Sequence, residues 1–404
     1  MIHLAVIDPQ RIGVRPGFVL NTMEFLTDDS HAKIPCELSG IIQNLEFVHR
    51  VSLFFSFVPS DRSAVTQDRQ LSVVEGFSHI DAHNIAEHPI NEHCIPIQDI
   101  NNRSIIHGSI DIRHLVVKRI RPPMILKRDI RSCGNPIFIG HRGSGANSYG
   151  SEIPENTIQS FNNAMTTPGI TGVELDVSLT LDRKLVVYHD IEKAHGGTKT
   201  PISCLSYASA SSMDGMGSPI LADVLRSLIP STAGIVIELK FVSNAFARKH
   251  PEYAKYTRGD LVEAVLDCLE ANWEHVEPRW IALSSFDPDI CLYLRKALPH
   301  TNALIVHNMW LGHESDKEDN TVDFTDARNR IWQHSFQQYD GLALEAAYIL
   351  SDKYDIDKSD PSSGNRLVFS YGRGNLKINN INEQYRRGVS AFFIDDMNLT
   401  NQFN

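Results

Sequence analysis

The sequence predicts an α/β protein: a TIM-type (β/α)8 barrel with an N-terminal all-β module. Its 404 residues exceed one typical domain and suit a barrel of about 250 residues plus a smaller module. From residue 136 onward, short apolar runs alternate with helical segments, the pattern of parallel strands joined by helices. Several of these runs end in charged or imidazole side chains, and the carboxyl ends of the strands are where such a barrel carries its chemistry.

The composition is that of an ordinary globular protein in a reducing compartment. Hydrophobic residues make up 42% and charged residues 22%, so the chain can bury a sizeable core. The net charge of −11 argues against a nucleic-acid partner, because nucleic-acid binding needs a basic face. The six cysteines are scattered without a Cys-x-x-Cys pair, no signal peptide is visible, and no apolar run approaches the roughly 18 residues that span a bilayer. We therefore expect a cytoplasmic protein with no membrane insertion.

Residues 1–117 predict the all-β module, whose partner the sequence does not reveal. The stretch 45–58 alternates as a strand does, and short apolar runs at 105–106 and 115–117 are further strand candidates. Residues 118–135 are basic and contain a Pro-Pro pair, so we expect an extended linker, since proline disfavours a helix at and before its own position. Residues 136–404 then form the barrel.

One cluster in the module raises the question of a metal site. Four histidines and a cysteine crowd a short stretch, but their spacings follow no familiar zinc pattern. We therefore interpret the cluster as a solvated polar loop, with a zinc site as the alternative. Its members are His79, His83, His88, His93 and Cys94.

Nine apolar runs in the barrel region predict strands. They cover residues 136–140, 172–177, 185–188, 234–239, 280–284, 303–307, 341–345, 367–371 and 391–395. The segments between them predict helices over 157–165, 222–228, 261–271 and 288–297.

A barrel needs eight strands, and the ninth is best explained by a hairpin. Too few residues separate Val177 from Leu185 for a parallel crossover, which takes about a dozen or more. Asp182-Arg183 reads as the tip of a hairpin that rises above the rim. Position 176 would then face position 189, which would bring His189 beside Asp176.

Three carboxylates at strand ends predict a metal site. Glu174 and Asp176 are two residues apart on one strand and therefore point to the same face. Such a pair repels unless a cation lies between them, and Glu238 on another strand supplies a third oxygen ligand. This set suits a hard divalent ion, Mg²⁺ or Ca²⁺. An acidic surface strand is the alternative, but the intervening positions of the first strand are all apolar.

Two histidines and two cations stand at the same strand ends. As a pair beside a metal site, His141 and His189 fit a general acid and a general base on opposite sides of a phosphorus centre. Lys240 shares a face with the carboxylate at 238 and could hold a phosphate oxygen; a solvated lysine is the alternative. Arg142 precedes Gly143, whose missing side chain would let a phosphate approach the backbone.

Five motifs, in order, resemble the glycerophosphodiester phosphodiesterase family. They are His-Arg-Gly at 141–143, Glu-Asn-Thr at 155–157, Glu-x-Asp at 174–176, His-Asp at 189–190 and Glu-x-Lys at 238–240, within a match over about 136–397. The resemblance implies metal ligation by the three carboxylates, acid/base catalysis by the two histidines, and phosphate contact by Arg142 and Lys240. It further implies four candidate phosphate or substrate contacts: Glu155, Asn156, Phe286 and Tyr371.

Within that family, the chain is similar to the eukaryotic glycerophosphocholine subgroup. The likeness lies in residues 284–291 and in the β-rich N-terminus. Tyr371 stands where the family usually has Trp, and Ile394-Asp395 where it has Thr-Asp. The N-terminus of the subgroup resembles a starch-binding module, but the first 270 residues here contain no Trp for sugar stacking. Glycan binding is therefore not expected.

The implied function is metal-dependent hydrolysis of a glycerophosphodiester to sn-glycerol 3-phosphate and an alcohol. The attacking group is either water or the glycerol 2-hydroxyl, through a cyclic phosphate. Two alternatives are a phospholipid-cleaving lyase of the related barrel type and an inactive barrel with a regulatory or scaffolding role. The aromatic residues Tyr149, Phe286 and Tyr371 could offer π-faces to a choline headgroup. If they only line the site, recognition would stop at the glycerol phosphate.

Overall fold

The structure is a computed structural model that describes most of the barrel region and the backbone of five N-terminal strands. The chain divides into two compact units, Met1–Val116 and Val117–Asn404. No helix within the described part of the chain is long and apolar enough to cross a membrane. Beyond the N-terminal strands, the described residues are 121–134, 136–150, 152–195, 198–212, 217–242, 246–247, 250–253, 255–309, 339–352 and 366–403.

The described strands of the first unit pair in antiparallel fashion. One sheet has the order β1 (Ala5–Val6), β2 (Arg50–Phe57), β3 (Val74–Asp81). A second pair consists of β4 (Ile90–Pro96) and β5 (Ser109–Leu115). Both pairings agree with a β-rich module.

The remaining expectations for this unit fall largely on residues outside the described part. Strand β2 lies within the stretch predicted at 45–58, whereas the run at 105–106 lies outside the described residues. The all-β character of the whole module therefore stays a prediction. The same holds for the histidine cluster: His83 and His88 lie outside the described residues, and only the backbone is described at His79, His93 and Cys94.

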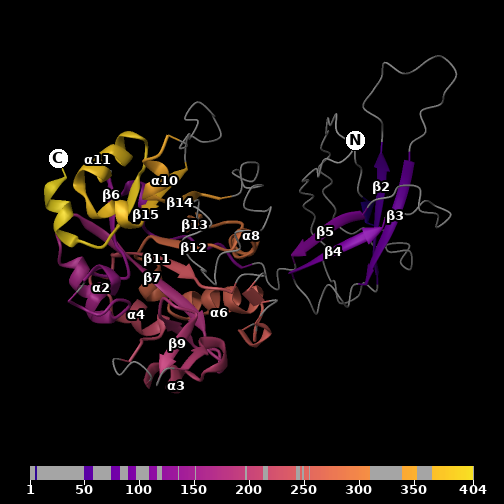
Figure 1. Ribbon diagram of the computed structural model, residues 1–404, viewed down its shortest axis with the longest axis horizontal. Coiled ribbons are helices and arrows are strands. Elements are labelled where there is room, and N and C mark those ends of the chain that lie inside the picture. Colours follow the sequence, from indigo (N-terminus) through magenta and orange to yellow (C-terminus); the bar gives the residue numbers. More distant parts are fainter. Residues whose placement is uncertain are drawn as a thin grey trace, which may run out of the picture. The chain divides into compact units, whose positions relative to one another are not determined.

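Eight parallel strands close into a ring in the second unit, as the sequence predicts (Figure 1). The ring closes because β16 pairs with β6, and β7 pairs with both β6 and β11. The strands are almost continuously buried, which explains their apolar sequences. In ring order they are β6 (Ile137–Gly140), β7 (Ile170–Leu179), β11 (Gly234–Leu239), β12 (Ile281–Ser285), β13 (Leu304–Met309), β14 (Gly341–Glu345), β15 (Leu367–Tyr371) and β16 (Ala391–Ile394).

The interior of the ring is filled by an apolar core, which gives way to polar side chains at the carboxyl ends of the strands. Val236, Ala282, Val306 and Phe369 belong to this core. Because side chains alternate along a strand, the residue two positions beyond a core residue returns to the same side, nearer the carboxyl end. Glu238 is such a residue, two positions beyond Val236. The core thus supports a layer of polar side chains at the mouth of the barrel.

The ninth predicted strand is the second arm of a hairpin, β8 (Leu185–Val187), antiparallel to the end of β7. Val177 pairs with Val187, so position 176 faces position 188 and the predicted register was wrong by one residue. The tip is a three-residue loop that ends in Arg183, whose φ of 59° is left-handed. The sequence predicts a two-residue tip, Asp182-Arg183. The Tyr188 amide donates to the Asp176 carbonyl at 3.0 Å, which still leaves His189 near the rim.

The four predicted helices are present outside the strands (Figure 1). They are α2 (Ile158–Met165), α4 (Leu221–Ser227), α6 (Arg258–Ala271) and α8 (Pro288–Ala297). Three of them, α2, α6 and α8, begin at a capping side chain. Thr157 caps α2, and Thr257 forms a capping box with Asp260 at the start of α6.

Several short elements were not predicted. The hairpin β9 (Glu192–His195) and β10 (Thr198–Pro201) follows His189. Four further described helices are α3 (Tyr207–Ser212), α7 (Trp273–Val276), α10 (Ala346–Ile349) and α11 (Ile378–Arg386). All are short, and α11 is mostly polar, so their apolar signal is weak.

The segment after Val117, expected to be an extended linker, packs on the barrel from Arg121 onward. Met124 forms a parallel β-bridge with Thr301, and Met124, Leu126 and Ile130 are buried. The Arg121 side chain is 2% exposed and contacts three carboxylates of α6. These are Glu263, Asp267 at 2.7 Å and Glu270 at 3.0 Å. A barrel expressed alone should therefore begin before Arg121.

Arg121→Ala should lower the free energy of unfolding of the barrel unit by about 2 kcal/mol, because a buried guanidinium with charged partners is lost. Denaturant titration of the full chain measures this. Lys127→Ala is a matched control on the same segment: Lys127 is 65% exposed and, among the described residues, pairs with Glu277 alone, so its loss should cost less than about 1 kcal/mol. Equal effects of the two substitutions would show that Arg121 does not anchor the segment.

Candidate active site

Three carboxylates meet at the carboxyl ends of β7 and β11. Glu238 pairs in register with Asp176 across the two strands, and Glu174 is two residues earlier on β7. One oxygen from each lies within 4.8 Å of the others, and all three residues are buried. The sequence predicted this convergence because parallel strands bring their carboxyl ends to one edge.

The electrostatics of this acidic cluster fit a divalent cation. Burial, with the neighbouring Asp176 carboxylate, raises the pKa of Glu174 to about 8. Burial would also raise the pKa of Asp176, but the surrounding charges, that of Lys240 first, lower it below its ordinary value. The protein's own cations thus leave part of the negative charge uncompensated. Carboxylate oxygens are the ligands that Mg²⁺ and Ca²⁺ prefer, so the donor set suits such an ion.

Lys240 and Arg142 lie directly against the acidic cluster. Nζ of Lys240 is 2.5 Å from Oε1 of Glu238 and 3.2 Å from Oδ1 of Asp176. The residue is 6% exposed, which excludes the solvated lysine considered from the sequence. The Arg142 amide donates to Glu174 at 2.9 Å, and its Nε is 3.7 Å from Asp176.

A left-handed turn after β6 aims Arg142 at the cluster. Arg142 has a φ of 50° and Gly143 a φ of 94°. A Cβ at Gly143 would lie 2.4 Å from Oγ of Ser160, so no other residue fits between this turn and α2. The glycine was predicted to admit a phosphate to the backbone. That stays a prediction; the structure shows that the glycine is also required for packing against α2.

Glu155 and Asn156 contact protein groups of the site. The Glu155 carboxylate accepts from Nη1 of Arg142 at 2.9 Å and from the Asn147 amide at 2.6 Å. Asn156 donates from Nδ2 to Asp176 at 2.8 Å and accepts from the Asp176 amide at 3.3 Å. Each of the two side chains therefore orients another candidate residue.

Each candidate histidine is held by a carboxylate. Nδ1 of His141 lies 2.7 Å from Oδ1 of Asp395, which also accepts from the Ala146 amide at 2.8 Å. Burial would lower the pKa of His141, but the Asp395 carboxylate raises it above its ordinary value. Nδ1 of His189 lies 2.7 Å from Oδ1 of Asp190. In both cases the bond leaves Nε2 as the nitrogen that can face a substrate.

Sequence reasoning missed two contacts of the site. In the sequence analysis, Asp395 appears only as part of Ile394-Asp395, where the family usually has Thr-Asp. A carboxylate that follows the eighth strand is nevertheless as strong a signal as the carboxylates of the acidic cluster. Asn308, at the carboxyl end of β13, donates from Nδ2 to Oε2 of Glu238 at 3.1 Å. An asparagine within an apolar strand was the available signal.

The aromatic candidates form one pair. The rings of Phe286 and Tyr371 are edge to face, with centroids 5.9 Å apart and planes at 85°. The Tyr371 hydroxyl donates to the Met309 carbonyl at 2.6 Å, and Nζ of Lys240 lies 5.9 Å from the Phe286 ring centroid. Among the described residues, no ring contact joins Tyr149 to this pair.

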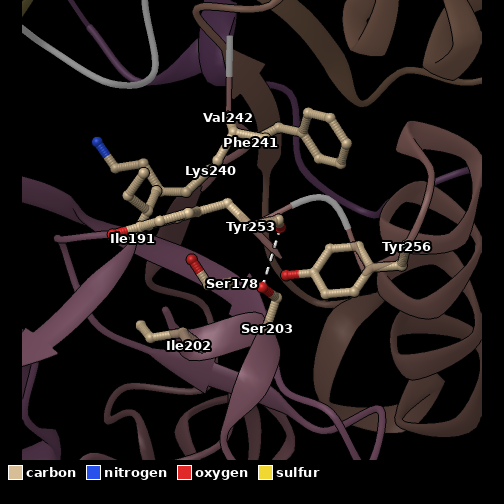
Figure 2. Close-up of a pocket in the computed structure, with 9 residues that line it drawn as sticks. All are labelled: Ser178, Ile191, Ile202, Ser203, Lys240, Phe241, Val242, Tyr253 and Tyr256. Carbon is tan, nitrogen blue, oxygen red and sulfur yellow. Dashed lines mark hydrogen bonds between the residues drawn. The ribbon is translucent and has the colours of Figure 1, made fainter. Parts of the chain in front are cut away.

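A small cavity of about 20 Å³ adjoins Lys240 (Figure 2). Oγ of Ser178, on β7 two residues after Asp176, is buried there without a hydrogen-bond partner among the described residues. Space of this size holds about one water molecule. The lining residues are Ser178, Ile191, Ile202, Ser203, Lys240, Phe241, Val242, Tyr253 and Tyr256.

The barrel region of this chain is similar to proteins of a known family. Residues 141–399 match the model of the "Glycerophosphoryl diester phosphodiesterase family". A Caenorhabditis elegans protein named as a homolog of the glycerophosphocholine phosphodiesterase GPCPD1 is 27% identical over 250 residues, which are 47% of this chain and 35% of that protein. The glycerophosphocholine phosphodiesterase gde1 of Schizosaccharomyces pombe is 25% identical over 330 residues, 64% of this chain and 27% of that protein.

Among solved structures, the glycerophosphodiester phosphodiesterase of Thermotoga maritima has a TM-score of 0.47 and 21% sequence identity, and the match covers 67% of this chain and 98% of that chain. The match covers only about a third or less of the length of the two eukaryotic relatives named above.

Proposed function

Because the chain belongs to the glycerophosphoryl diester phosphodiesterase family, we propose that it hydrolyses glycerophosphodiesters to sn-glycerol 3-phosphate and an alcohol. Glycerophosphocholine is the proposed substrate, since several relatives are named as glycerophosphocholine phosphodiesterases. One observation carries the proposal: two histidines, each held at Nδ1 by a carboxylate 2.7 Å away, accompany a buried acidic cluster.

The acidic cluster, Glu174, Asp176 and Glu238, would hold the divalent cation, Mg²⁺ or Ca²⁺. Such an ion withdraws negative charge from phosphoryl oxygens, which is among the largest contributions to phosphodiester cleavage. Lys240 and Arg142 would bind the remaining phosphoryl oxygens. Glu155 would act as a positioning residue for Arg142, because a carboxylate repels a phosphate.

The two histidines would move the protons. One accepts a proton at Nε2 from the attacking oxygen, and the other donates a proton from Nε2 to the leaving alkoxide. Asp395 and Asp190 would hold the imidazoles in the tautomer that exposes Nε2 and would stabilise each imidazolium when it forms.

The proposed activity is tested by incubating the purified full chain with glycerophosphocholine and a divalent cation, and measuring sn-glycerol 3-phosphate and choline. Both products should appear in equal amounts and only with the cation. An analogue without the glycerol 2-hydroxyl separates the two routes: it is cleaved if water attacks and resists cleavage if a cyclic phosphate is required. Absence of turnover with every glycerophosphodiester tried would favour the scaffolding alternative.

A cytoplasmic location is also proposed. The described cysteines, Cys133, Cys204, Cys268 and Cys291, are all free, which suits a reducing compartment.

Phe286→Leu should weaken catalysis on glycerophosphocholine more than on glycerophosphoinositol. If choline packs on the face of Phe286, the substitution should cost about 0.5–2 kcal/mol of binding free energy, which raises KM roughly 2- to 30-fold. Inositol carries no cation and would not make this contact. Tyr371→Phe is the control, because it keeps the edge-to-face ring and removes the hydroxyl that donates to Met309. Equal rises for both substrates would mean that the ring lines the site without reading the headgroup.

A further inference from the structure

Asn308 lies at the mouth of the barrel, beside the acidic cluster. Leu304 and Val306, on the same strand, belong to the barrel core. Alternation along the strand puts Asn308 on the same side, one step nearer the carboxyl end. The residue is 5% exposed, so its carboxamide is held among protein groups. A side-chain amide at this position contributes little to apolar packing, so its nitrogen and its oxygen each need a polar partner.

The nitrogen of this amide is accounted for. Nδ2 of Asn308 lies 3.1 Å from Oε2 of Glu238 and 3.4 Å from Oγ of Ser284. An ionised carboxylate only accepts hydrogen bonds, so the nitrogen and not the oxygen of the amide must face Glu238. The orientation of the carboxamide therefore follows from the chemistry of its neighbour.

The oxygen of the amide is not accounted for. Oδ1 of Asn308 is buried and has no hydrogen-bond partner among the described residues. Buried carbonyl oxygens nearly always have a partner, because losing water without a replacement is costly. It is bonded to the same carbon as Nδ2, so it lies close to the Glu238 carboxylate. A metal ion or a substrate group at the mouth of the barrel would supply the missing partner.

We infer that Asn308 supplies a further oxygen ligand to the divalent cation, in addition to Glu174, Asp176 and Glu238. The inference rests on the metal site of the proposed function. Ca²⁺ takes six to eight oxygens, side-chain amide oxygens among them, and Mg²⁺ takes six. Three carboxylates leave positions open, the more so since Oε1 of Glu238 already lies 2.5 Å from Nζ of Lys240. The competing occupant of Oδ1 is a hydroxyl group of the substrate.

Two substitutions separate the two halves of the amide. Asn308→Leu removes both the nitrogen and the oxygen at similar volume, whereas Asn308→Asp keeps an oxygen ligand and loses the N–H donor. We expect calorimetric titration of the metal-free full chain with Ca²⁺ and with Mg²⁺ to show at least about a tenfold loss of affinity in N308L. N308D should bind at least as tightly as the unchanged protein. Ser284→Ala, which removes only the 3.4 Å contact, should leave the affinity unchanged.

Three outcomes would overturn the inference. Unchanged metal affinity in N308L, with a raised KM at saturating metal, would assign Oδ1 to a substrate hydroxyl. Equal losses in N308L and N308D would mean that Asn308 acts only through its N–H on Glu238. If N308L shows no cooperative melting, N308D alone decides, and weaker binding than in the unchanged protein refutes the idea. Because binding is measured without substrate, absence of turnover would count against the proposed function and not against this ligand.

Discussion

Removing the divalent cation should abolish turnover of glycerophosphocholine. The acidic cluster is buried, and Lys240 and Arg142 already contact its carboxylates, so the ion is needed to supply the positive charge that binds an anionic phosphodiester. After chelation and confirmation by mass spectrometry that no metal remains, activity should be undetectable and should return on addition of Ca²⁺ or Mg²⁺. Full turnover in metal-free protein would refute the metal site.

Glu238→Gln sharpens this test, because it keeps the shape of the side chain and removes one negative charge. Metal affinity and kcat should both fall strongly. Glu192→Gln is the matched control: Glu192 is a carboxylate on β9 that contacts Tyr253 and Lys199 and lies outside the acidic cluster. The Glu192→Gln variant should bind the metal as tightly as the unchanged protein. A metal at 100 times its dissociation constant should also stabilise the folded chain by about 2.7 kcal/mol, seen as a rise in Tm.

His141→Ala and His189→Ala should each lower kcat by roughly 10² to 10⁴, the usual range for a positioned acid or base. Both side chains lie at the rim of the barrel, so Tm should change little. His275→Ala provides the control, since His275 lies on α7 and pairs with the exposed Glu274. A kcat near normal in either active-site variant would remove that histidine from the proton transfers.

Asp395→Asn should give a smaller loss of kcat with KM nearly unchanged, because Asp395 acts through His141. The pH profile of kcat distinguishes a positioning role from a purely structural one. Without the carboxylate, which raises the pKa of His141, the limb that reports this histidine should move to lower pH. An unchanged profile with a lowered Tm would make Asp395 a stabilising residue only.

The amino-acid sequence by itself determined the barrel and the acidic cluster. Strands buried on both faces must be apolar throughout, so each one is visible as a short apolar run. Glu174, Asp176 and Glu238 stood out because a buried carboxylate has no packing purpose at a strand end. Parallel strands then bring those ends together without further information.

Only the tertiary structure decided which groups orient the site. Asp395 holds His141 across 254 residues of sequence, and Asn308 reaches Glu238 across 70. No local pattern encodes such pairs, because hydrogen bonds between distant strands depend on register and side-chain direction. The packing of Arg121 on α6 was likewise hidden, because the sequence of a basic segment does not show whether its charged side chains contact carboxylates of the barrel. Residue propensity and periodicity predict local secondary structure. These contacts form only when closure of the ring brings distant strands and helices together.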